Sequence, residues 1–237
     1  MIRPMSKKVV VFSGAGMSEE SGINTFRDAD GLWEGHDFLT VASLDGWRKD
    51  PQLVLDFYNE RRRHLLNVSP NLGHIALAEL AEHADVSIVT QNVDNLHERA
   101  GCKNVIHLHG ELLKSESSAN PNLTFDCLGD ITLNDRCPLG SQLRPHIVWF
   151  GEAVDKLDNA IAEVMSADIL IIIGTSLQVY PAAGLVSFIR PNVPVYYIDA
   201  DPATNIELES VANLTVIKNT AAIGVPELVK ALKESFS

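Results

Sequence analysis

The stretch VVVFSGAGMS at residues 9–18 decides the fold, because an apolar strand runs directly into a turn that contains two glycines. In an open α/β sheet, such a turn lets backbone amides approach a pyrophosphate, and the following helix offers its positive end to the same anion. The pattern also occurs in strand–turn–helix segments that bind no ligand. Glu19 stands where the dinucleotide fingerprint has its third glycine. No clear acidic ribose ligand follows a second strand about 20 residues later, which disfavours a standard dehydrogenase.

Beyond this turn, short β-branched runs alternate with helical patterns, as a parallel sheet with crossover helices requires. Continuous apolar strands indicate helices on both faces of the sheet, so we expect a doubly wound, Rossmann-like α/β fold. The predicted strands are 9–13, 86–90, 105–108, 147–149, 169–173, 195–199 and 214–217. The predicted helices are 53–66, 73–83, 94–100, 158–165, 182–189 and 226–236.

Two stretches interrupt the alternation. Residues 27–70 have helical patterning without a convincing strand, and residues 111–145 are polar and weakly periodic. We interpret both as insertions that form a smaller module beside the sheet. The predicted domains are therefore a dinucleotide-binding domain of residues 1–27, 71–110 and 146–237, and a small inserted module of residues 28–70 and 111–145.

Composition limits the partners and the compartment. Nineteen basic and 31 acidic residues give a net charge of −12, which disfavours nucleic acid and anionic membranes as partners. The charge would suit a basic, lysine-bearing protein, although acidity also serves solubility alone. No apolar run approaches the roughly 20 residues that span a bilayer, and Cys102, Cys127 and Cys137 form no CxxC pair. We expect a cytoplasmic monomer.

Polar motifs follow two further predicted strands. Gln91, Asn92 and Asp94 lie where a strand ends and a helix begins, so their amides and carboxylate could bind ribose hydroxyls and a carboxamide. Asn and Asp are also ordinary helix caps. His107 and His109 end another strand on one face, where one of them could act as a base, although such a pair is often a packing or surface feature.

Together the motifs resemble those of the sirtuin family in order and approximate spacing, from Val9 to about Pro226. Each motif alone is ambiguous, whereas their joint occurrence is specific. The matching motifs are Gly14 to Ser18, Gly22 to Arg27, Thr90 to His97, His107 to Gly110, Ile147 to Glu152 and Gly174 to Ala182.

The resemblance implies that NAD is the cofactor. The glycine turn would hold its phosphates, a loop with Phe26 and Arg27 would cover the reacting ribose, and Asp94 would fix the nicotinamide carboxamide. An acylated-lysine protein would be the partner, its peptide added as a strand between 150–152 and 177–179. The implied cofactor-binding residues are Gly14, Ala15, Gly16, Ser18, Phe26, Arg27, Trp33, Gln91, Asn92, Val93, Asp94, Gly174, Thr175, Ser176, Asp199, Ala200, Asp201 and Ala221. The implied peptide-binding residues are Val148, Phe150, Gly151, Glu152 and Val179.

In the mechanism that the resemblance implies, the acyl oxygen of the lysine amide attacks the nicotinamide ribose carbon, and nicotinamide leaves an imidate on ADP-ribose. His109 is the general base for a ribose hydroxyl that then takes over the acyl group, and Asn92 is the second catalytic residue. A free imidazole titrates at about 6.5, so neutral base is available near neutral pH. We expect His109→Ala to keep the fold and NAD binding and to lose deacylation.

Tyr58 and Arg61 stand three residues apart on one face of a predicted helix, where a phenol and a guanidinium could receive a carboxylate. They resemble the Tyr-x-x-Arg pair of sirtuins that remove succinyl and malonyl groups, with Ala29 leaving space for the acyl chain. The run Arg61-Arg62-Arg63 alone would indicate a solvated face. We therefore expect activity on acetyl-lysine and on succinyl-lysine or malonyl-lysine.

Most sirtuins hold zinc with four cysteines, whereas residues 111–145 contain only Cys127 and Cys137 and have Ser115-Glu116-Ser117 where a cysteine would be expected. We expect no zinc. Two other functions stay open. A mono-ADP-ribosyltransferase could use the same nicotinamide displacement, and a non-catalytic NAD sensor would not need His109 or the 150–152 cleft.

Overall fold

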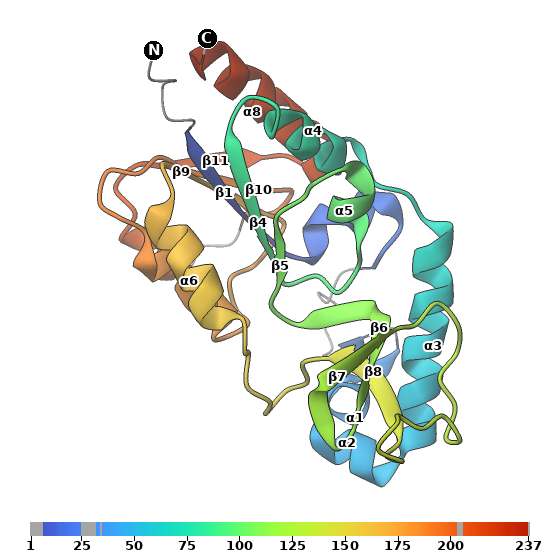
Figure 1. Cartoon of the computed structure of the whole chain (residues 1–237). Coiled ribbons are helices and arrows are strands. Elements are labelled where there is room, and N and C mark those ends of the chain that lie inside the picture. The colour runs from blue at the N-terminus through green and yellow to red at the C-terminus, as the bar shows by residue number, and fades with distance from the viewer. Residues whose placement is uncertain (1–6, 25–31, 34, 203–205, 237) are drawn as a thin grey trace.

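Six parallel strands form the central sheet, in the order β5-β4-β1-β9-β10-β11 (Figure 1). In the computed structural model, which describes residues 7–24, 32–33, 35–202 and 206–236, the chain thus enters this sheet in the order 3-2-1-4-5-6 of dinucleotide-binding folds. The order reverses between β1 and β9, where such folds bind their ligands. The strands are β1 (Lys8–Ser13), β4 (Asp85–Thr90), β5 (Val105–His107), β9 (Ile169–Ile173), β10 (Val195–Asp199) and β11 (Leu214–Lys218).

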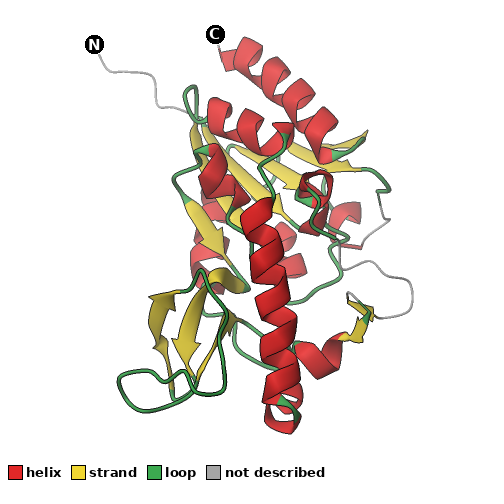
Figure 2. Ribbon diagram, turned by 90° about the vertical axis from the view of Figure 1, so that its right-hand side faces the viewer, coloured by secondary structure: helices red, strands yellow, loops and turns green. Residues whose placement is uncertain are grey.

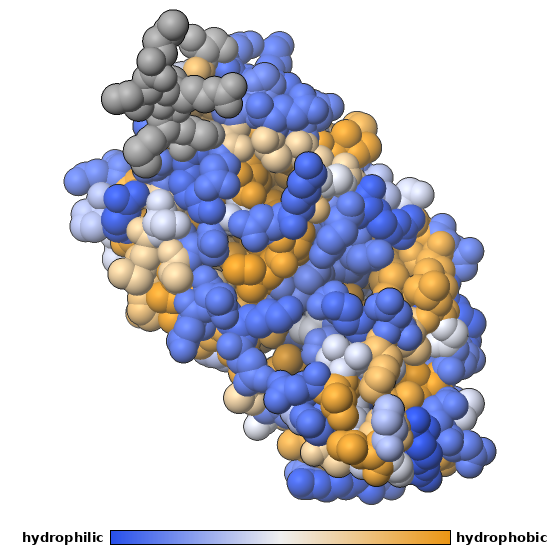
Figure 3. Space-filling view, in the orientation of Figure 1, coloured by the Kyte–Doolittle hydropathy of each residue, from blue (hydrophilic) through white to orange (hydrophobic). Residues whose placement is uncertain are grey.

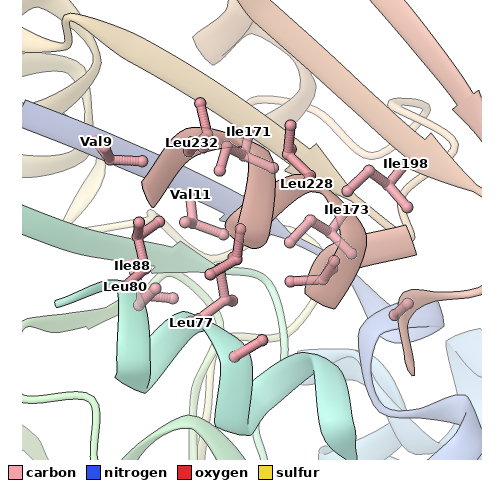
Figure 4. Close-up of a cluster of buried hydrophobic side chains, with 14 of the residues drawn as sticks. Val9, Val11, Leu77, Leu80, Ile88, Ile171, Ile173, Ile198, Leu228 and Leu232 are labelled. Carbon is pink, nitrogen blue, oxygen red and sulfur yellow. The ribbon is translucent and has the colours of Figure 1, made fainter. Parts of the chain in front are cut away.

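Helices cover both faces of this sheet, which confirms the predicted fold class. Val9 and Val11 of β1 face α4 and α8 (Figure 4), whereas Val10 and Phe12 face α6 and η3 on the other side. Each fully buried aliphatic side chain contributes about 1.5–3 kcal/mol. The covering elements are α4 (Leu72–Leu80), α5 (Leu96–Ala100), α6 (Leu157–Ser166), the 3-10 helix η3 (Ala182–Phe188), α7 (Ile206–Glu209) and α8 (Ala221–Phe236).

A second, antiparallel sheet with the strand order β7-β6-β8 lies below the first, beside the long helix α3 (Figure 2). Its core joins α3 to residues such as Leu112, Ile147 and Trp149. The elements of this region are β2 (Leu32–Trp33), β3 (His36–Asp37), α1 (Phe38–Val41), α2 (Leu44–Lys49), α3 (Pro51–Asn67), β6 (Gly110–Ser117), β7 (Asn120–Asp126) and β8 (Leu143–Ile147). The domain boundaries drawn from the sequence stay a prediction.

Some sequence-based expectations were wrong. The strand predicted at 147–149 is absent from the parallel sheet, because β8 ends at Ile147 in the antiparallel sheet and the following backbone bonds to His109 and Ala42. Helix α8 begins at Ala221, five residues before Pro226, because Ala221 and Val225 also pack into the core.

Polar side chains cover most of the face in Figure 3, in keeping with the net charge of −12. Over the described residues, none of the helices combines the length and the apolar character needed to cross a membrane.

Candidate active site

Two glycine turns meet at the point where the strand order reverses. The Gly16 N–H donates to the Gly174 carbonyl at 2.9 Å, and a Cβ on Gly16 would lie 2.8 Å from Gly174 Cα. Gly174 has φ +58°, and its own Cβ would lie 2.4 Å from Gly16 C. Only glycine fits such an approach, so the two turns present bare backbone at the carboxyl ends of β1 and β9.

The first glycine turn is not followed by the continuous helix that the sequence predicted. The chain instead makes two three-residue 3-10 helices, η1 (Ala15–Met17) and η2 (Glu19–Ser21). So short a run has little macrodipole, and an anion would be bound by the individual backbone N–H groups of the turn.

A cleft beside these turns brings together predicted residues that are far apart in the sequence. Asp201 does not line it, and its N–H instead donates to Asp199 Oδ1 at 2.9 Å. Sequence reasoning missed Glu19, Glu20, Ile198 and Thr220 as lining residues. The cleft is lined by Gly16, Glu19, Glu20, Gly174, Ile198, Asp199, Ala200, Thr220 and Ala221.

Ser18, Asn92 and Asp94 form a buried polar cluster. Ser18 Oγ donates to Asp94 Oδ2 at 2.9 Å, and Asn92 Nδ2 donates to Ser18 Oγ at 3.2 Å. Asp94 Oδ1 accepts from Leu96 N at 3.0 Å, so Asp94 also binds the first N–H of α5. Burial raises the Asp94 pKa, and these hydrogen bonds oppose the shift. A carboxylate has about four acceptor sites, so Asp94 retains capacity for an amide donor.

A chain of buried hydrogen bonds stabilises the loop that contains Gln91 and Asn92. Thr90 Oγ1 accepts from Asn92 N at 3.0 Å and from Ser13 Oγ at 2.9 Å. Ser13 Oγ in turn lies 3.0 Å from His97 Nε2. Gln91 Nε2 donates to Thr175 Oγ1 at 3.0 Å and so ties the ends of β4 and β9 together.

The two histidines at the end of β5 bond to this loop but differ in electrostatics. His109 Nδ1 lies 3.0 Å from the Gln91 carbonyl, so this nitrogen has the proton and Nε2 the lone pair. Burial lowers the His109 pKa, against the effect of that carbonyl. His107 is bonded on both sides, to Asn92 O at 2.9 Å and Glu98 Oε1 at 2.7 Å. Burial lowers the His107 pKa, but the Glu98 carboxylate outweighs it and the net shift is upward. Burial thus favours the neutral form of His109, whereas the Glu98 carboxylate favours the protonated form of His107.

The segment after β8 leads from His109 to the predicted peptide site. Val148 N–H donates to the His109 carbonyl and Phe150 N–H to the Ala42 carbonyl, both at 2.9 Å. These donors are therefore already used within the protein. The backbone of Gly151 makes no hydrogen bond to any other described residue, and its φ is +91°. Glu152 turns inward, where its carboxylate accepts from Arg144 Nη2 at 2.8 Å.

The predicted acyl-binding pair lies on α3 beside this segment. Tyr58 is fully buried, and its hydroxyl accepts from Trp149 Nε1 at 3.1 Å. Arg61 is partly buried, with its guanidinium 3.4 Å from the centre of the Phe57 ring. The other arginines of the run differ. Arg62 is fully buried and donates to Leu112 O at 2.9 Å, whereas Arg63 is exposed and pairs with Asp130 at 2.6 Å. The interpretation of this arginine run as a solvated face therefore applies to Arg63 only.

The comparisons with known proteins agree with this geometry. The model of the Sir2 family matches residues 14–181, well over half of the chain. The chain belongs to the Sir2 family. A Helicobacter pylori protein (strain ATCC 700392 / 26695) named NAD-dependent protein deacylase is 54% identical over 98% of this chain and 100% of its own length. One of the same name from Bacteroides thetaiotaomicron is 48% identical, covering 95% of this chain and 98% of its own.

Solved structures give the same family. A Sir2 homologue in complex with NAD has a TM-score of 0.87 at 38% identity, over 98% of this Sir2 chain and 91% of its own. A complex described as Sir2, p53 peptide and NAD+ has a TM-score of 0.76 at 29% identity, over 97% of this chain and 93% of its own.

Residues 111–145 supply only two cysteines, Cys127 and Cys137. Cys127 Sγ donates to Gly129 O at 3.4 Å and Cys137 Sγ to Ser117 Oγ at 3.2 Å. Among the residues that the structure describes, no group of three or more His, Cys, Asp or Glu side chains could hold a metal ion. The residues present do not fit a structural zinc site, which needs four such ligands. The absence of zinc stays a prediction.

Some predicted residues of this Sir2 site cannot be placed. Phe26, Arg27 and Ala29 lie outside the described residues, as does the side chain of Trp33. Trp149, in contrast, was missed by sequence reasoning although it lies inside a matching motif, because nothing in the sequence places its indole beside Tyr58.

Proposed function

We propose that the chain is an NAD-dependent protein lysine deacylase that removes acetyl groups and also succinyl or malonyl groups, releasing nicotinamide and O-acyl-ADP-ribose. Its family and its deacylase-named relatives support the reaction type. The observation on which the catalytic assignment rests is the hydrogen bond from His109 Nδ1 to the Gln91 carbonyl, which leaves Nε2 as the basic nitrogen.

Bound NAD would supply an electrophilic ribose carbon and nicotinamide as the leaving group. Gly14 and Gly16 would hold its phosphates, and Asn92 a ribose hydroxyl. His109 Nε2 would take the proton of a ribose hydroxyl, and its lowered pKa keeps it unprotonated at neutral pH.

The proposed acyl range rests on the electrostatics around Tyr58. Burial dominates and raises the Tyr58 pKa, but the positive charges of Arg61 and Arg144 act in the opposite direction. The Arg61 guanidinium therefore favours negative charge near this hydroxyl, whereas the Arg144 guanidinium is already paired with Glu116 and Glu152. The carboxylate of a succinyl or malonyl group supplies that charge, and an acetyl group does not.

An acyl-peptide panel tests the proposal. Purified protein is incubated with NAD and acetyl-, succinyl- or malonyl-lysine peptides, and mass analysis detects O-acyl-ADP-ribose. Turnover that attaches ADP-ribose to protein instead would indicate a mono-ADP-ribosyltransferase, and binding of NAD without turnover would indicate a sensor. His109→Ala should retain the NAD-induced rise in Tm and lose deacylation. Normal turnover by this variant would refute the base assignment.

The acyl range is tested by Arg61→Met with Arg63→Met as its matched control. Loss of the guanidinium at 61 should lower kcat/KM for the succinyl peptide at least tenfold relative to the acetyl peptide, mostly through KM. The exposed Arg63, paired with Asp130, should be replaceable without effect. An unchanged ratio in Arg61→Met would contradict the proposed range.

The remaining assignments belong to the same proposal. A net charge of −12 and three scattered thiols support a cytoplasmic monomer that acts on acylated-lysine proteins without binding nucleic acid or membrane. Size-exclusion chromatography with light scattering would test the monomer.

A further inference from the structure

Trp149 lies in the predicted peptide segment and contacts Tyr58 of the predicted acyl-binding pair. It is 2% exposed, and its indole N–H donates to the Tyr58 hydroxyl at 3.1 Å. The ring centroids of Trp149 and Tyr58 lie 6.4 Å apart. The ring of Trp47 also packs against Trp149, with the centroids 5.7 Å apart. The indole thus donates to a buried phenol that lies within the field of the Arg61 guanidinium.

An ion pair fixes both the backbone and the ring of Trp149. Its backbone N–H donates to Glu152 Oε2 at 2.8 Å, and Arg144 Nη2 binds the same carboxylate at 2.8 and 3.1 Å. The Arg144 guanidinium also lies 4.1 Å from the centre of the indole ring. Arg144 is itself anchored through Nε to the buried Glu116, at 2.6 Å. The indole therefore has little freedom to turn away from Tyr58.

This bond sets the direction of the Tyr58 hydroxyl. Because the phenol oxygen accepts from the indole, its single proton must point away from Trp149. A hydroxyl that accepts one hydrogen bond is also a better donor in the next. Donation from Tyr58 matters to an acyl group that ends in a carboxylate and not to one that ends in a methyl group.

We propose that Trp149 is a specificity-determining positioning residue, which orients the Tyr58 hydroxyl toward the carboxylate of an acidic acyl-lysine. The inference rests on the proposed function, because it presupposes that acidic acyl groups enter this pocket. Trp149 does not itself touch the reacting atoms. Its removal should therefore change the choice between acyl groups more than the rate of the common chemical step.

Trp149→Phe removes the N–H and keeps an aromatic ring. The ratio of kcat/KM for succinyl over acetyl peptide should fall roughly 3- to 12-fold, the range for one hydrogen bond, with KM for the succinyl peptide bearing most of the change. Trp47→Phe is the control, since the Trp47 indole nitrogen makes no hydrogen bond among the described residues. Its ratio should stay within twofold of the parent. An unchanged ratio in Trp149→Phe, or an equal fall in Trp47→Phe, overturns the inference.

Two further measurements keep the test decisive. Tyr58→Phe should lower the same ratio, and adding Trp149→Phe to it should have no further effect, whereas additive losses would refute the coupling. If Trp149→Phe does not fold, β-(3-benzothienyl)alanine at position 149 replaces the N–H by sulfur with little change of shape, and the same fall is expected. A parent protein that turns over acetyl but not succinyl or malonyl peptides refutes the proposed acyl range instead.

Discussion

Gly174→Ala should be the most damaging conservative change at the cofactor cradle. Gly174 has φ +58°, which costs an L residue about 1–2 kcal/mol. The added Cβ would lie 2.4 Å from Gly16 C and Met17 N, whereas ordinary contacts are 3.4–4 Å. Either turn must therefore move by about 1 Å, and overpacking of this kind costs about 1–3 kcal/mol. We expect a loss of roughly 2–5 kcal/mol and weakened NAD binding.

Substitutions at two other glycines distinguish the cost of backbone strain from the cost of a steric clash. Gly140 has φ +80° and nothing within 4 Å of its Cβ, so Gly140→Ala should cost only the strain of about 1–2 kcal/mol. Gly129 has neither a positive φ nor a neighbour within 4 Å. Gly129→Ala should change stability by less than about 1 kcal/mol, because it affects mainly the unfolded chain.

Urea unfolding with and without NAD measures both effects, and each kcal/mol should also lower Tm by about 2–4 °C in a chain of this size. Gly140→Ala and Gly129→Ala should keep the full NAD-induced stabilisation, while Gly174→Ala should lose most of it. A Gly174→Ala protein as stable as Gly140→Ala and equally stabilised by NAD would show that the close approach of the two turns is not what the cradle requires.

Further predictions concern titration and metal. Because burial lowers the His109 pKa below 6.5, kcat/KM should fall toward low pH with a midpoint below 6.5; a midpoint above 6.5 would contradict this. Burial lowers the His74 pKa to about 4, so its neutral form contributes stability above pH 6.5 that is lost as pH falls toward 4, about 3 kcal/mol in all. His74→Asn should show a shallower loss of urea-unfolding free energy over that range, and an identical slope would exclude His74 as its source. Elemental analysis should find less than 0.1 zinc per chain, roughly the background expected with no four-ligand site, and EDTA should leave Tm unchanged; stoichiometric zinc would show that Cys127 and Cys137 belong to a site after all.

The sequence predicted those parts of the structure whose signal is local. Continuous apolar runs such as Ile169–Ile173 gave the strands of the parallel sheet almost to the residue, because both faces of such a strand are buried. The segment after β8 misled the same reasoning. It is apolar because Trp149 packs against α3, a contact between segments 91 residues apart that no local period reports.

The small antiparallel sheet was missed for a related reason. Buried polar residues such as Ser115 and Glu116 break the alternation by which a half-buried strand is recognised. Glu116 is tolerated there because Arg144 and His146 both bind its carboxylate at 2.6 Å. Likewise, the sequence could not show that Arg62 is the buried arginine of the run. Its burial depends on the hydrogen bond to the Leu112 carbonyl, which lies 50 residues away in the sequence.

Residue types alone left a local structural role and ligand binding both open for Asp94, and the structure shows the local role. One oxygen accepts from the Leu96 N–H at the start of α5, and the other accepts from Ser18 Oγ. These bonds hold the carboxylate in place, as the proposed binding of a carboxamide would require. Gln91 likewise makes two different contacts. Its side chain donates to Thr175, and its backbone carbonyl sets the tautomer of His109. In the proposed site, a ligand that displaced the Gln91 amide from Thr175 would act on the loop that bonds to His109, so ribose binding and the orientation of His109 would be coupled through one residue.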